Sequence, residues 1–571
     1  MFRKSKKNQQ LNFFDAQQLM SAKMSQQLHK SWAQTFREAV LERIPEEIFA
    51  VLFSEIDSRP NAPINILVSG DMLKSGFGWT DDELEEHMNF DLLTRHALGL
   101  DELSQEAPTL RTVYNLRRRV REYAEKTGIN LYEQVFAHFT DTQITRLKLK
   151  TGWQRMDSTQ LLSNIARLNR LELVIAVLQK GVSGLPKSQQ QAWQEAEEQY
   201  LSKPPQNVCY RIRAADTEGH LLRVGELLLA LWEELRECNG DEQAIALVER
   251  ILAEQYEIKD NQVTLKAEEE IATSSMQSPH DPEATYREKN GESYQGYVIN
   301  LSETCDSDNP LQLITSVQTA TNNTDDGQLL ADTLDDLDER GIAIEQATVD
   351  GGYNGDTAEE ACDKHSVTLR PTTLRGRPSA PDQFGWEAYT WVWDKATQSG
   401  TVTCPGGQTK SLQRGSKENR LLARFDRQIC ANCPFYKQKC RVEELKKKPP
   451  TLYVKQRSIQ VALLRQGMSA ENYAIRANTE STVHAFKHPF SGGKLPVRGL
   501  IRSHMVACGS ALMVNLHRLH NYLSQKEEKS IEDSCVSLQI YLFWHSVTTF
   551  LSRFLRRRAI ISYDYSAVIS I

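Results

Sequence analysis

The sequence lacks the features of a membrane or secreted protein. It contains no run of about 18 consecutive apolar residues, so we expect no membrane-spanning helix. The basic residues at positions 3–7 are not followed by an apolar core, which argues against a secretory signal. Ten cysteines in 571 residues do not suggest a disulfide scaffold. We therefore expect a cytoplasmic protein.

The sequence also lacks an excess of positive charge, because its net charge is −7. That sum argues weakly against a nucleic-acid partner, but the distribution of charge matters more. Any single basic cluster is typical of a solvated helix face, whereas five separate clusters favour a polyanion as partner. The clusters lie at residues 3–7, 111–121, 370–377, 446–448 and 553–558.

Helical and β-rich patterns divide the chain. Residues 1–130 show helical periodicity, and a capping box is expected at Thr80 and Glu83. Another helix carries Val113, Leu116 and Val120 on one face and arginines on the opposite face, which suits contact with a DNA backbone. The opposing arginines that we expect to bind DNA are Arg117, Arg118, Arg119 and Arg121.

The remaining pattern predicts an α/β fold. A short strand is expected to end near Asp157, and a helix should follow it. After a strongly helical stretch, residues 294–304 and 311–321 predict a hairpin, and a helix, a strand ending at Asp350, a helix and a strand follow. This order fits a mixed sheet with flanking helices, together with an N-terminal all-helical domain and an inserted helical region.

Asp350 is a candidate ligand or catalytic group at a strand end, where α/β sheets place such residues. Gly351 and Gly352 follow it, and glycines permit both close approach and positive φ. Neither G-x-G-x-x-G nor G-x-x-x-x-G-K-[ST] occurs, which disfavours a phosphate loop. Taken alone, Asp350 and Asp157 are better explained as turn-forming or helix-capping residues. Together, two such carboxylates suit Mg²⁺, as a pair in a two-metal site.

A later helix supplies a third acid. Glu480 shares one helical face with basic and aromatic residues, because their spacings are three or four residues. As a site, Glu480 would bind a metal while its neighbours hold phosphates; as an ordinary solvent-facing surface, the same residues would form i,i+4 pairs. The other residues of this face are Tyr473, Arg476, His484 and Lys487.

Four residues of this helix match a known pattern. Tyr473-(2)-Arg476-(3)-Glu480-(6)-Lys487 resembles the Y-(2)-R-(3)-E-(6)-K pattern of DDE transposases of bacterial insertion sequences. The segments "MDSTQ" and "VDGGY" are similar to those that carry the first and second aspartates of that family. The resemblance covers roughly residues 45–520 and does not reach the tail.

The resemblance implies a ribonuclease-H-like catalytic domain with Asp157, Asp350 and Glu480 as its Mg²⁺-binding triad, with Mn²⁺ as a substitute. It implies that Tyr473, Arg476 and Lys487 position the DNA end. The activity implied is metal-dependent cleavage at the terminal inverted repeats of the element, followed by strand transfer into target DNA. It also implies a homodimer in a synaptic complex and association with the bacterial nucleoid.

On this basis we predict seven segments. They are an N-terminal helical DNA-binding domain (1–130), the first part of the catalytic domain (145–165), a helical insertion (166–270), the continued catalytic domain (271–375), a β-rich insertion (376–457), the C-terminal helices of the catalytic domain (458–525) and a tail (526–571).

Four cysteines in the β-rich insertion could hold Zn²⁺. Cys430 and Cys433 form a C-x2-C knuckle, and Cys404 and Cys440 lie on either side of it. Four thiolates suit a tetrahedral structural Zn²⁺ site, but the irregular spacing leaves unbound cysteines as the alternative. Similar clusters in related transposases favour zinc.

Two other functions compete with an active transposase. A degenerate transposase would grip DNA without cutting it, although the intact set of three acids argues against this. A plain metal-dependent nuclease of the same fold would not need the large N-terminal helical module.

Overall fold

The computed structural model describes residues 2–5, 19–54, 60–260, 262–289, 291–373, 382–394, 397, 399–415, 419–436, 439–443, 449–468 and 470–527. The side chains of residues 470–473 and 476 lie outside this description. Two of the predicted basic clusters (446–448 and 553–558), residues 6–7 and 374–377 of two others, and nearly all of the predicted tail also lie outside it.

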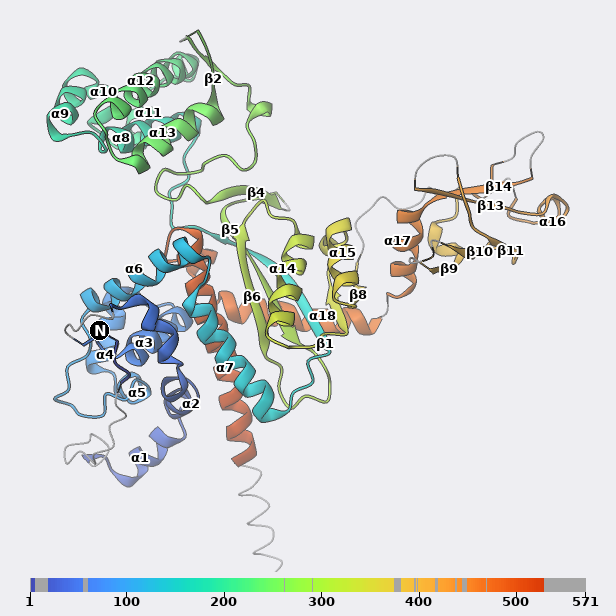
Figure 1. The fold of residues 1–571 in the computed structure, drawn as a ribbon, viewed down its shortest axis with the longest axis horizontal. Helices are drawn as coiled ribbons and strands as arrows, with labels where there is room; N and C mark the ends of the chain where they lie inside the picture. The colour runs from blue at the N-terminus through green and yellow to red at the C-terminus, as the bar shows by residue number, and fades with distance from the viewer. Residues whose placement is uncertain are drawn as a thin grey trace, which may run out of the picture.

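A six-stranded mixed sheet lies at the centre of the molecule (Figure 1). β5 pairs antiparallel with β1 along one edge, and with β4 and then β6 along the other. β7 and β8 continue the sheet beyond β1 and run parallel to it. The strands are β1 (Trp153–Leu162), β4 (Thr285–Lys289), β5 (Glu292–Thr304), β6 (Ile314–Thr321), β7 (Gln346–Val349) and β8 (Thr368–Pro371).

The predicted end of the first strand is wrong. β1 continues through Asp157 to Leu162, and no helix starts until Arg170. The reason is the long antiparallel ladder with β5, which pairs every residue from Gln154 to Leu162 and satisfies their backbone groups. Asp157 is therefore a mid-strand residue and does not cap a helix.

The other predicted elements of the sheet are confirmed. β5 and β6 form the expected hairpin, and β7 ends immediately before Asp350. The two expected helices are α14 (Asp326–Glu339) and α15 (Asp356–Lys364).

Helices cover both faces of the sheet. Met156, Ala347 and Val349 pack with residues of α14 and α15 on one face. On the other face, Leu161, Ile299 and Leu301 belong to a core that includes the helix at residues 500–527. α18 (Ala470–Lys487) packs on β1 and β7.

The N-terminal helices share that second core. The capping box at Thr80 and Glu83 is confirmed, and Val113, Leu116 and Val120 are buried as predicted. α7 contacts β6, so this helical module packs directly against the sheet. The helices are α1 (Ala22–His29), α2 (Trp32–Ala39), α3 (Ile64–Phe77), α4 (Asp81–Phe90), α5 (Leu92–Ala97), α6 (Leu110–Thr127) and α7 (Leu131–Leu147).

A helical region is inserted between β1 and β4 and has its own core. It stands apart from the sheet at the upper left of Figure 1. Its elements are α8 (Arg170–Val182), α9 (Lys187–Ala196), α10 (Glu198–Leu201), α11 (Pro205–Cys209), α12 (Thr217–Glu237), α13 (Glu242–Gln255), β2 (Tyr256–Lys259) and β3 (Gln262–Leu265).

A β-rich module between β8 and α18 also has its own core and lies at the right of Figure 1. Ile459 and Ala462 of α17 are buried in that core, so the helix after residue 458 packs with the β-rich module. The elements are β9 (Thr390–Asp394), β10 (Ser399–Thr403), β11 (Thr409–Ser411), β12 (Gln413–Arg414), β13 (Arg420–Arg424), α16 (Arg427–Ala431), β14 (Thr451–Lys455) and α17 (Gln456–Gln466). Across the described part of the chain, no helix has the length and apolar character needed to cross a membrane.

Candidate active site

Asp157 lies in β1, and Asp350 directly follows the neighbouring parallel strand β7. The register pairs Gln154 with Ala347 and Arg155 with Thr348. Continued by two residues, this register places Asp157 level with Asp350, on strands that lie about 4.8 Å apart. Residues separated by nearly two hundred positions are therefore neighbours in space.

Both aspartates lie on the sheet face that α18 covers. Successive side chains of a strand point to opposite faces. Met156 and Val349 pack on the α14 side, and Asp350 keeps an extended backbone, so Asp157 and Asp350 point to the other side. Both side chains are half-buried.

One oxygen of Asp350 is used as a helix cap. Its Oδ1 accepts a hydrogen bond of 2.6 Å from the backbone N–H of Gly352. Gly352 belongs to the 3₁₀ turn Gly351–Tyr353, which Asp350 caps. The capping role expected as an alternative is thus present, and it fixes the direction of the carboxylate. A carboxylate has two oxygens, so capping does not prevent a second role. Neither Gly351 nor Gly352 has a positive φ, so the glycines are not needed for a left-handed backbone.

Two hydrogen bonds set the direction of α18 along β1. Arg155 Nη1 donates to the carbonyl oxygen of Ile475 at 3.1 Å. Further along, Lys487 Nζ donates to the carbonyl oxygen of Gln160 at 3.3 Å. The helix and the strand therefore run in the same direction.

This alignment places Glu480 level with Asp157. Glu480 lies five residues beyond Ile475, or about 7.5 Å along the helix axis. Asp157 lies two residues beyond Arg155, or about 7 Å along the strand. The three predicted acids therefore occur at about the same level, the two aspartates at the sheet and Glu480 on the helix that covers it.

The three carboxylates are not drawn together as metal ligands. Among the described residues, no group of three or more His, Cys, Asp or Glu side chains is placed to hold a metal ion. Glu480 is exposed, while the buried face of α18 carries Thr479, Thr482 and Phe486. The donors have the oxygen chemistry that Mg²⁺ requires, but not its short ligand distances.

A buried ionic network fixes α18 to the sheet, and sequence reasoning missed it. Glu303 of β5 is fully buried and receives hydrogen bonds from Arg155 Nε at 2.7 Å and Arg518 Nη1 at 2.8 Å. Thr482 Oγ1 donates to the same carboxylate at 2.8 Å. The available signal was a glutamate inside the otherwise uncharged strand sequence "YVINLSET".

Tyr353 lies beneath the two aspartates and was also missed. Its ring is fully buried, and its hydroxyl donates to Asn300 Oδ1 at 2.6 Å. Burial, and then the carboxylates of Asp157, Asp326 and Asp350, raises the pKa of Tyr353 well above its ordinary value. The phenol therefore stays protonated next to a concentration of negative charge.

The other predicted residues of α18 differ in their exposure to solvent. Lys487 is half-buried, and desolvation lowers its pKa, followed by the charge of Lys289. His484 is exposed. The side chains of Tyr473 and Arg476 lie outside the described residues.

The four arginines of α6 have different partners. Arg117 binds Asp71 and, at 2.7 Å, Asp81, which holds it inside the helical module. Arg119 stacks over the ring of Phe53 at 5.1 Å. Arg118 and Arg121 form surface pairs with glutamates one helical turn later.

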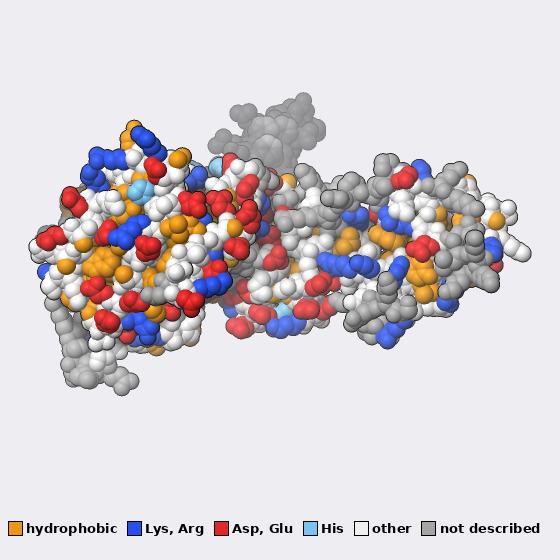
Figure 2. Space-filling view, turned by 90° about the horizontal axis from the view of Figure 1, so that it is seen from above, with side chains coloured by type: hydrophobic (Ala, Val, Ile, Leu, Met, Phe, Trp, Pro, Cys, Tyr) orange, Lys and Arg blue, Asp and Glu red, His pale blue; other side chains and the backbone are white. Residues whose placement is uncertain are grey.

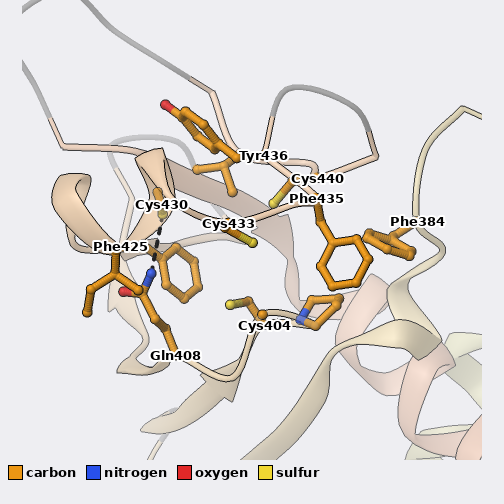
Figure 3. Close-up of a pocket in the computed structure, with 13 residues that line it drawn as sticks. Phe384, Cys404, Gln408, Phe425, Cys430, Cys433, Phe435, Tyr436 and Cys440 are labelled. Atoms are coloured by element: carbon orange, nitrogen blue, oxygen red, sulfur yellow. Dashed lines mark hydrogen bonds between the residues drawn. The ribbon is translucent and has the colours of Figure 1, made fainter.

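The four cysteines line one small cavity of about 20 Å³, shown in Figure 3. A Cβ atom on Gly406 would lie 2.9 Å from Cys433 Sγ and 3.7 Å from Cys404 Sγ, so these sulfur atoms are near neighbours. Burial, and then the neighbouring thiols, raises the pKa of Cys430 and Cys440. Gln408 Nε2 donates to Cys430 Sγ at 3.4 Å.

Comparison with models of protein families gives a match to the C-terminal part of the chain. Residues 403–520, about a fifth of the chain, match the family model described as a transposase DDE domain. The matched region contains the four cysteines and Glu480, but neither Asp157 nor Asp350. No curated protein matches the chain. This part of the chain is therefore similar to a transposase DDE domain.

Proposed function

We propose that this protein is a DNA transposase that cleaves the ends of an insertion sequence and transfers the cut strand into target DNA. In this proposal the mixed sheet is a ribonuclease-H-like catalytic domain. The parallel strands β1, β7 and β8, the antiparallel strand β5 and the helices on both faces support that assignment.

The observation that carries the proposal is the level placement of three acids. Two come from adjacent parallel strands, and the third comes from a helix that is anchored to the first of those strands. Unrelated surface acids would not be expected to share one level, since the three segments are distant in the sequence. Asp157, Asp350 and Glu480 are therefore the proposed catalytic residues.

These three residues would hold Mg²⁺, or Mn²⁺ in its place. Bound divalent metals would activate the attacking oxygen and stabilise the leaving oxygen of an in-line displacement. Within the chain, the Glu303 network holds α18 in register with β1, and the Asp350 cap orients its carboxylate. Lys487, beside the end of β1, would bind a phosphate of the DNA end, together with Tyr473 and Arg476.

We also propose a structural Zn²⁺ held by Cys404, Cys430, Cys433 and Cys440. Four thiols around a cavity of about 20 Å³ have the donor chemistry that Zn²⁺ prefers. The ion would crosslink a small β-rich module.

The proposed partners are the terminal inverted repeats, target DNA and a second copy of the chain. Figure 2 shows acidic and basic side chains interspersed on the face that it displays, rather than one continuous basic field. DNA binding would therefore depend on local clusters. The proposed contacts of the N-terminal module are Arg118, Arg119 and Arg121 on α6, with Arg117 supporting them from inside.

The test is a cleavage assay with purified protein, DNA carrying the ends of the element, and Mg²⁺. Cleaved ends and joined products should appear only when metal is added. Binding of the ends without cleavage at any metal concentration would contradict the proposal and favour a DNA-binding protein without catalytic activity.

A further inference from the structure

The loop between α10 and α12 forms an unusual surface on the helical insertion. From residue 199 to residue 215 the chain has three basic residues and no acidic one, within a region otherwise rich in glutamate. Lys203, Arg211 and Arg213 are all exposed. In the described part of the chain, none of the three forms an ion pair with a carboxylate, whereas nearby Arg223 binds Glu197 at 2.7 Å.

An exposed aromatic ring accompanies these cations. Tyr210 is 92% exposed, more than any other large hydrophobic side chain described. An isolated exposed tyrosine needs no explanation. Here, however, Tyr210 directly precedes Arg211, which lines a surface hollow of about 510 Å³ together with Lys203, Asn207 and Arg213.

The loop is a fixed platform. Tyr200 and Val208 are buried in the core of the insertion, which anchors the loop on both sides of Lys203. Gln179 Nε2 donates to the carbonyl oxygens of Tyr200 at 2.6 Å and Lys203 at 2.8 Å. Ile212 also packs against this core, so the backbone that carries the three cations is held in place before any partner arrives.

We propose that this platform, formed by Lys203, Tyr210, Arg211 and Arg213, binds the phosphate backbone of duplex DNA. Arginine, lysine and the hydroxyl and amide groups of tyrosine and asparagine are the usual phosphate contacts. The unpaired cations attract a polyanion locally, and the acidic residues around them repel it. Glu198 and Asp216 also line the hollow, and their carboxylates would repel phosphate, so the DNA backbone would lie along Tyr210 to Arg213.

This inference rests on the proposed function only in naming DNA as the partner, because no catalytic residue takes part. It assigns the helical insertion a role: the insertion grips DNA outside the active site without reading its sequence.

The test measures binding of a short duplex of arbitrary sequence by fluorescence anisotropy over a range of salt concentrations, without divalent metal. The test variant is Lys203→Ala/Arg211→Ala/Arg213→Ala. The control is Arg223→Ala/Arg236→Ala/Lys259→Ala, which removes the same charge from the same region but takes cations already engaged by a carboxylate or a ring. Circular dichroism checks that both variants fold.

The platform variant should lose about 2 to 3 units from the slope of log K against log salt, because each phosphate contact contributes about 0.9. The control should keep the slope of the unmodified protein. Tyr210→Phe should weaken binding if the hydroxyl contacts phosphate. An unchanged slope in the platform variant, or an equal loss in the control, would overturn the inference. Because no cleavage is measured, failure of the catalytic proposal gives a different result from failure of this one.

Discussion

Adjacent arginines on α6 differ in what they do. Arg117 is held by Asp71, whose side chain is almost fully buried, whereas Arg118 lies on the surface beside Glu122. Helical spacing placed both on a basic face. Helical spacing could not distinguish the buried arginine from the exposed one. Asp71 is far away in the sequence, and only the folding of α3 next to α6 brings it close to Arg117.

Arg117→Ala should lower the free energy of unfolding by about 3 kcal/mol, because it leaves the buried carboxylate of Asp71 without its cation. Arg118→Ala should change that free energy by less than about 0.5 kcal/mol, because exposed pairs contribute little. Urea unfolding of the two variants measures both quantities.

The two substitutions should affect DNA binding in the opposite order to their effect on stability. Arg118→Ala should weaken binding of end DNA, while folded Arg117→Ala protein should bind nearly as well as the unmodified chain. Equal unfolding free energies for the two variants would show that the contact between Arg117 and Asp71 is unimportant for folding.

At the scale of elements, the position of α18 along β1 determines where Glu480 lies relative to Asp157. Glu303 connects β5, β1, α18 and the helix at residues 500–527 through Arg155, Thr482 and Arg518. Thr482 is two residues from Glu480. The network thus controls where the exposed carboxylate stands relative to Asp157.

Thr482→Val should raise the Mg²⁺ concentration needed for half-maximal cleavage, because α18 loses its hydroxyl bond to Glu303. The loss in stability should be only about 1 kcal/mol, as expected for one hydrogen-bonding group. Thr482→Ser, which keeps the hydroxyl, should restore the Mg²⁺ requirement. If Thr482→Val lowers stability but leaves the Mg²⁺ requirement unchanged, the network has no part in placing Glu480.

Periodicity predicted most elements of the sheet but not the length of β1. The β5–β6 hairpin, β7, α15 and β8 follow from alternation and turn residues close in the sequence. β1 carries the polar run Ser158-Thr159-Gln160, which by itself suggests a strand end. Only pairing with β5, more than a hundred residues later, keeps that run extended.

At the scale of the whole molecule, two insertions with separate cores interrupt the sheet domain. Their boundaries are visible in composition, since glutamate-rich helices and tryptophan-rich strands differ from the sheet around them. Composition does not show that Asp157, Asp350 and Glu480 lie at the same level in the folded chain. Their grouping was inferred from a resemblance, and the family match reaches only the last of the three residues.

The stability of the β-rich module should depend on the Zn²⁺ that we propose for it. Removing zinc with a chelator should lower the melting temperature of this module and leave the rest of the chain folded, because its core is separate. Cys430→Ser should reproduce the effect, and Cys209→Ser in the helical insertion is the matched control. Elemental analysis that finds less than about half a zinc per chain would exclude the site, since structural zinc sites are normally filled.

The most direct test of the account compares cleavage by Asp157→Asn, Asp350→Asn and Glu480→Gln with cleavage by Asp356→Asn, whose exposed side chain follows the same strand as Asp350. The three site variants should bind end DNA as tightly as the unmodified protein and cut it at least a thousandfold more slowly, equivalent to about 4 kcal/mol of activation free energy. Asp356→Asn should cut normally. If any of the three site variants cuts as fast as the unmodified chain, the assignment of that carboxylate to the active site is wrong.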